Sequence, residues 1–125
     1  MIQGKVKVVR HKEMIAFVGD NTTGWLADKP DGFGHRTTAK CVFGQRRNEG
    51  KLAGGFGTCE FVDGDGDKFY AVWTETPDKQ TIVSGTGKYD GITGVFEVAS
   101  RQPHPRPADG EFLESTRNIG SYKLP

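Results

Sequence analysis

The sequence contains little that would build helices, disulfide frameworks or membrane spans. Four leucines and seven alanines stand against ten valines, eleven threonines and eight phenylalanines. Because β-branched and aromatic residues favour strands, and because the 18 glycines would weaken helices, this composition predicts an all-β protein. Two cysteines are too few for a disulfide-dense secreted scaffold. No stretch approaches the ~20 apolar residues of a membrane-spanning helix.

The sequence also has no large excess of positive or of negative charge. Lys and Arg total 17 against 16 for Asp and Glu, so the formal net charge is +1. A nucleic-acid or membrane-surface protein would normally need a basic excess on one face, and we therefore expect neither partner. The length of 125 residues predicts a single domain over residues 1–125. The first residues lack the apolar run of a signal peptide, so we expect a cytoplasmic protein, although a removed leader would leave the same mature sequence.

Short apolar-rich segments recur between Gly, Asp, Asn and Pro residues, at the spacing of about 8–12 residues that is typical of meandering barrels and sandwiches. Val6–His11 and Glu13–Val18 are expected as two strands or as one long strand with a bend. The other expected strands are Thr37–Arg47, Leu52–Val62, Lys68–Glu75, Thr81–Gly85, Ile92–Ser100 and Glu111–Tyr122, which makes seven or eight strands in all. A turn is expected at Gly19–Gly24, a loop at Trp25–Arg36, and a three-residue hairpin loop at Asn48–Gly50.

Several of these strands are apolar on both faces. In the segment Phe69–Glu75, for example, Phe69, Ala71 and Trp73 alternate with Tyr70 and Val72. One face would fill the interior, and the other would meet another layer or another subunit. We therefore expect a homo-oligomer.

The two cysteines lie in consecutive strands around the hairpin loop at Asn48–Gly50. With a symmetric three-residue loop, Cys41 would face Gly57 rather than Cys59. A β-bulge among the nearby glycines could shift the register by two and bring the sulfur atoms together. Between these alternatives we favour reduced thiols.

Three motifs resemble ligand sites but lack a required part. Asp63–Asp67 resembles the start of an EF-hand loop, yet Lys68 stands where that loop needs Gly and Thr74 where it needs Glu. Gly85–Lys88 resembles a phosphate-binding loop, but strand rather than helix follows it. The three histidines are not spaced as metal ligands. We expect no metal and no cofactor.

The run Thr81–Gly94 resembles the GTGxFxGaxG segment of the allene oxide cyclase/dirigent barrel-like superfamily. The likeness extends over about residues 37–100, through the two cysteine strands, Asp63–Asp67 and the aromatic segment Phe69–Trp73. It is strongest with small bacterial members of that group. The resemblance implies a single antiparallel eight-stranded barrel with an apolar central cavity, frequently assembled as a trimer.

The plant cyclases of this superfamily use a carboxylate on the first strand and a proline after a Gly-Asp pair, and this sequence has neither at the matching positions. Cys41, in its Ala-x-Cys-Val setting, does match a pocket residue of the plant enzymes. The resemblance therefore implies the cavity and does not carry the plant reaction to this chain.

From these observations we expect an isomerase or cyclase that acts on a compact hydrophobic substrate inside the barrel, with a non-catalytic binding or dirigent-like guiding protein as the alternative. A carboxylate among apolar neighbours could exchange a proton at working pH. The candidate acids are Glu60, Glu75 and Glu97, each with Phe, Trp, Val, Ala or Thr two positions away. The expected substrate contacts are Cys41, Phe43, Trp73, Phe56 and Tyr70.

Overall fold

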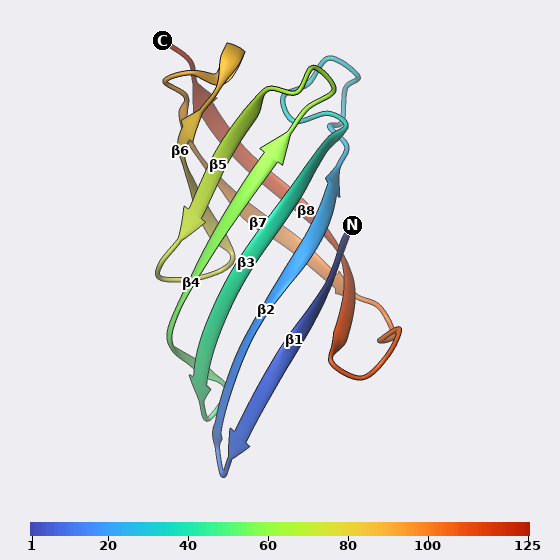
Figure 1. Ribbon diagram of the computed structural model, residues 1–125, viewed down its shortest axis with the longest axis vertical. Helices are drawn as coiled ribbons and strands as arrows, with labels where there is room; N and C mark the ends of the chain where they lie inside the picture. Colours follow the sequence, from blue (N-terminus) through green and yellow to red (C-terminus); the bar gives the residue numbers. More distant parts are fainter.

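The computed structural model describes all of residues 1–125, which form eight strands and one short 3-10 helix. In chain order these are β1 (Ile2–His11), β2 (Met14–Trp25), β3 (Thr37–Asn48), β4 (Lys51–Val62), β5 (Lys68–Trp73), β6 (Lys79–Gly85), η1 (Gly87–Tyr89), β7 (Thr93–Pro103) and β8 (Glu111–Lys123). Each strand pairs antiparallel with the next, and β8 pairs with β1, so that one sheet closes in a ring (Figure 1). The prediction of an all-β fold with eight antiparallel strands is confirmed.

Strand β2 is longer than the sequence predicts. The segment Gly19–Gly24 is not a turn, because each of its residues pairs with β3. Gly19 permits the close approach of the neighbouring strand: a Cβ atom on it would lie 2.0 Å from the carbonyl oxygen of Lys5. Pairing on both sides of β2 has overridden the local turn preference of Asp20 and Asn21.

The β3–β4 hairpin joins the two cysteines in a disulfide, so the prediction of reduced thiols is wrong. Its loop has two residues, Glu49 and Gly50, both at positive φ, as a tight hairpin turn requires. A bulge opposite Arg46 and Arg47 then adds one residue to β4. The shorter loop and the bulge each shift the register by one residue, and together they place Cys41 opposite Cys59.

An aromatic cluster fills one end of the ring. Phe61 and Phe69 stack with their centroids 4.5 Å apart, and Trp25 meets Phe61 at 4.6 Å. The loop after β2 adds Phe33, and η1 adds Tyr89, so both segments close this end of the ring. We call this region the packed end.

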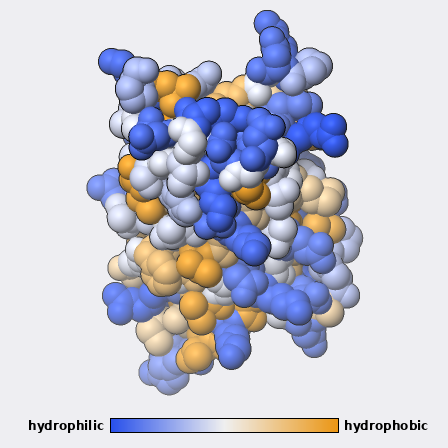
Figure 2. Space-filling model, turned by 45° about the horizontal axis from the view of Figure 1, so that its top comes forward, coloured by the Kyte–Doolittle hydropathy of each residue, from blue (hydrophilic) through white to orange (hydrophobic).

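Apolar side chains also remain on the outside of the ring. Val18, Val42 and Phe56, on the adjacent strands β2, β3 and β4, are each about half exposed. Figure 2 shows apolar side chains gathered in the lower part of one face, below a hydrophilic top. The homo-oligomer, expected as a trimer, stays a prediction.

Candidate functional site

The candidate site is a pocket of about 420 Å³ inside the ring. It lies towards the end that carries the β1–β2 hairpin and the β5–β6 loop, since Arg10, Ile15 and Pro77 line it. Trp25 and Phe96 of the packed end also line it and form its floor. The pocket is thus closed below by aromatic rings and open at the opposite end of the ring.

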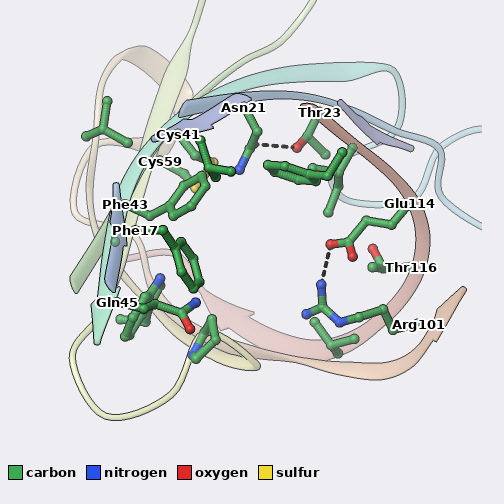
Figure 3. A pocket seen from close by; sticks show the side chains of 18 of the residues that line it. Phe17, Asn21, Thr23, Cys41, Phe43, Gln45, Cys59, Arg101, Glu114 and Thr116 are labelled. Atoms are coloured by element: carbon green, nitrogen blue, oxygen red, sulfur yellow. Dashed lines mark hydrogen bonds and ion pairs between the residues drawn. A yellow bond between two sulfur atoms is a disulfide. The ribbon is translucent and has the colours of Figure 1, made fainter. Parts of the chain in front are cut away.

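One wall of the pocket is aromatic. Phe17 of β2 meets Phe43 of β3 edge-to-face at 6.3 Å, and Phe43 meets Phe112 of β8 at 6.0 Å. These residues occupy inward positions because side chains alternate between the two faces of a strand. The disulfide of Cys41 and Cys59 continues the same wall, as Figure 3 shows.

Trp73 of β5 contributes an indole ring to this lining. The ring lies against Gly57 of β4: a Cβ atom on Gly57 would come within 1.9 Å of Trp73 Nε1. Gly57 and its neighbour Gly55 therefore provide the space that the indole ring occupies.

The part of the lining that β7 and β8 form beyond Phe112 is polar and carries an ion pair (Figure 3). Arg101 of β7 donates hydrogen bonds to Glu114 of β8 and, over 2.7 Å, to Asp78 of the β5–β6 loop. Burial opposes the charged form of Arg101, but the hydrogen bonds to Glu114 and Asp78 outweigh it and raise the Arg101 pKa above its ordinary value. The Glu114 side chain is only 15% exposed. This pair places two opposite charges in the lining of the pocket, where Arg10, Arg106 and Glu111 add further charged groups.

Uncharged polar groups complete the lining. Thr23 donates a hydrogen bond to Asn21 over 3.1 Å, and Asn118 donates one to Thr116 over 3.4 Å. The oxygen Oε1 of Gln80 is buried and accepts no hydrogen bond. A buried acceptor without a donor lowers the stability of the fold.

The structure divides the predicted substrate contacts into two groups. Cys41, Phe43 and Trp73 line the pocket, and their contact with a substrate stays a prediction. Phe56 and Tyr70 do not, and this part of the prediction is corrected. Phe56 is 50% exposed on the outside, where its ring covers Gly44. Tyr70, also on the outer face of its strand, donates a hydrogen bond to Glu60 over 3.2 Å.

The prediction that one of three glutamates lines the pocket is wrong. Glu60 lies on the outer face of β4, with Oε1 3.4 Å from the Lys68 ammonium. Glu97 lies outside on β7, with Oε1 4.0 Å from the Lys79 ammonium, and Glu75 is exposed after the end of β5. Both faces of β4 and β7 carry apolar residues, so alternation alone did not decide which face turns inward.

Two glutamates that the sequence did not single out, Glu111 and Glu114, line the pocket, and Glu114 is the one paired with Arg101. It has Phe112 and Thr116 two positions away, the same pattern that selected the three other glutamates, so this signal was available. Arg101 was harder to find. A bulge at Ala99 in β7 reverses the alternation of the following residues and turns Arg101 inward.

The carboxylates of the aspartate-rich hairpin after β4 are paired with the ammonium group of Lys88. The Lys88 ammonium lies 2.7 Å from carboxylate oxygens of both Asp63 and Asp65. Burial of Asp63 favours its neutral form, but hydrogen bonds from Lys88, from Tyr89 and from two backbone N–H groups outweigh it and lower the Asp63 pKa to about 2. Burial and the hydrogen bond to Asp63 raise the pKa of Tyr89 to about 12. No group of three or more His, Cys, Asp and Glu side chains could hold a metal ion.

Comparisons with protein-family models, with curated proteins and with solved structures found no match to this chain. The resemblance to the allene oxide cyclase/dirigent superfamily, carried mainly by the glycine pattern of Gly85–Gly94, therefore stays a prediction. None of the helical segments has the length and hydropathy that a membrane-crossing helix needs.

Proposed function

We propose that the protein binds a compact, mainly apolar small molecule in the pocket inside the ring. The observation that supports this proposal is the pocket itself: its volume of about 420 Å³ falls within the ~300–1,000 Å³ that is typical of small-molecule sites. Aromatic rings on one wall would exclude water from the apolar part of the ligand. The paired charges of Arg101 and Glu114 would orient a single polar group.

Adjacent valines on β1 allow a direct test of this proposal. Val8 lines the pocket, whereas Val9 points outward and is 65% exposed. We expect isothermal titration calorimetry to detect binding of 1-anilinonaphthalene-8-sulfonate, a compact aromatic probe with one anionic group. Val8→Trp should fill the pocket and weaken this binding at least tenfold, and Val9→Trp should leave it unchanged. Absence of binding, or equal effects of the two variants, would refute the proposal.

The second candidate function is the isomerase or cyclase activity expected from the sequence. Glu114 supports it, because it places a carboxylate in the pocket beside Phe112. A positioned carboxylate can transfer a proton, and the rigid wall could hold a flexible substrate in a reactive conformation.

Glu114→Gln separates this candidate from simple binding, because it keeps the shape of the side chain and removes its titration. A ligand recovered from the purified protein would be incubated with both forms, and its isomer composition followed by NMR. An enzyme should lose turnover and retain affinity, and Glu60→Gln, on the outer face, should change neither. Conversion of the ligand at the same rate by Glu114→Gln would exclude Glu114 as the acid or base.

A further inference from the structure

Arg101 bonds two carboxylates that the chain holds with different firmness. Its Nη1 group donates to Glu114, on the neighbouring strand β8, and its Nη2 group donates to Asp78, in the β5–β6 loop, over 2.7 Å. The Glu114 side chain is 15% exposed, whereas the Asp78 side chain is 60% exposed. An exposed ion pair contributes little to stability, because water solvates its charges when the pair opens. The bond to Asp78 is therefore the one that can open at low cost.

The backbone at Asp78 is fixed, so that only the side chain has to move. The Val98 N–H of β7 donates to the Asp78 carbonyl oxygen over 2.8 Å. The Asp78 N–H donates to Thr76 Oγ1 over 3.2 Å. Rotation of the Asp78 side chain carries its carboxylate away from Arg101 while both of these bonds stay in place. The Nη2 group of Arg101 is then a free donor.

The guanidinium group of Arg101 faces the pocket. Figure 3 shows it extending into the cavity beside Glu114. Pro77, next to Asp78 in the chain, also lines the pocket, so this loop lies at its edge. A molecule inside the pocket can therefore reach the donor that Asp78 releases.

The charges of the lining favour an anion. Three arginines, Arg10, Arg101 and Arg106, line the pocket together with only two charged residues of the opposite sign, Glu111 and Glu114. Arg10 and Arg106 form no ion pair within the chain. A lining with an excess of positive charge attracts anions. When a ligand anion replaces the loop carboxylate at Arg101, the number of charges around this arginine stays the same.

We propose that the pocket selects organic anions, apolar molecules that carry one carboxylate or sulfonate group, and that this group replaces Asp78 at Arg101. The inference rests on the proposed binding function and adds the charge of the ligand to it. The planar guanidinium group matches the oxygens of such an anion, as it matches those of Asp78. A neutral molecule cannot replace the charge of Asp78, so it leaves Asp78 in place and gains nothing at Arg101.

Two probes that differ only in the anionic group test the proposal. These are 1-anilinonaphthalene-8-sulfonate and its neutral analogue N-phenyl-1-naphthylamine, titrated into the full chain and followed by fluorescence. Asp78→Asn removes the competing carboxylate and should strengthen binding of the sulfonate roughly fivefold, while binding of the neutral probe stays the same. Glu75→Gln is the matched control, because it removes the same charge from an exposed position of the same loop. It should leave the binding of both probes unchanged.

Carbon-13 NMR of the Asp78 carboxyl group follows the exchange in the unsubstituted protein. Saturation with the sulfonate should shift this signal towards that of a solvated aspartate, and saturation with the neutral probe should leave it in place. Equal effects of Asp78→Asn on the two probes, an equal gain in Glu75→Gln, or an unchanged Asp78 signal would overturn the proposal. The proposed function would survive these results, because the sulfonate would still bind in the pocket. Absence of sulfonate binding would refute both.

Discussion

Replacement of phenylalanines at different places in the ring should separate the packed end from the pocket. Phe69 is 0% exposed and contacts Phe61, Phe33 and Tyr89, so Phe69→Ala opens a cavity that its neighbours cannot close. Such substitutions cost about 3–5 kcal/mol. Lost aromatic pairs are each worth about 0.5–1.5 kcal/mol beyond their buried area, which places Phe69→Ala at the upper part of that range.

Two further phenylalanines serve as matched comparisons. Phe43 already borders the pocket, so Phe43→Ala enlarges an existing space, and we expect a cost of roughly 1–2 kcal/mol. Phe56 is 50% exposed, and Phe56→Ala should cost about 1 kcal/mol or less.

Urea denaturation followed by far-UV circular dichroism measures all three free energies of unfolding. Because a typical domain is stable by about 5–15 kcal/mol, Phe69→Ala should unfold at a much lower urea concentration than the other two variants. Equal losses for Phe69→Ala and Phe43→Ala would refute the assignment of one end as packed and the other as open.

Three further predictions use other features of the ring. Replacing Cys41 and Cys59 by Ala should lower the free energy of unfolding by about 2–3 kcal/mol, because the disulfide closes a loop of 18 residues. Urea unfolding of the unsubstituted protein with and without a reductant measures the same loss, and a stability that does not change with reductant would contradict the prediction. The folded pKa of Asp63 lies below its ordinary 3.8, so the stability that its charged form contributes is present above about pH 4 and is lost as the pH falls towards 2. Asp63→Asn should therefore make the free energy of unfolding less dependent on pH in this range. Acid unfolding curves measure this, and the same pH dependence in both proteins would contradict the prediction. Gln80→Leu removes an unpaired buried acceptor and should raise the free energy of unfolding by about 1 kcal/mol, whereas a loss of stability would show that Oε1 has a partner.

The fold was largely predictable because its signals are local. Alternation, glycine-rich turns and scarce helix formers led directly to antiparallel strands. The errors arose where pairing between distant strands decides the outcome. The segment Gly19–Gly24 carries turn-forming residues, and only its two neighbouring strands make it extended.

The site was less predictable because two bulges change which face a residue occupies. The bulge in β4 contributes to the pairing of Cys41 with Cys59, and the bulge in β7 turns Arg101 into the pocket. A single extra residue reverses the faces that the following side chains occupy, and the type of that residue does not predict the bulge. Glu114, by contrast, lies on a strand without a bulge, and its neighbours could have identified it.

The contrast between the two ends of the ring has a consequence for how such a chain can evolve. Phe61, Phe69 and Ile92 are almost fully buried at or near the packed end, so substitutions there are selected mainly through the folded fraction. Side chains around the pocket, such as Val8, Phe17 and Phe43, contribute less to that fraction and more to the shape of the space that they enclose. The shape of the pocket can therefore change through substitutions at the open end, while the packed end preserves the stability of the fold.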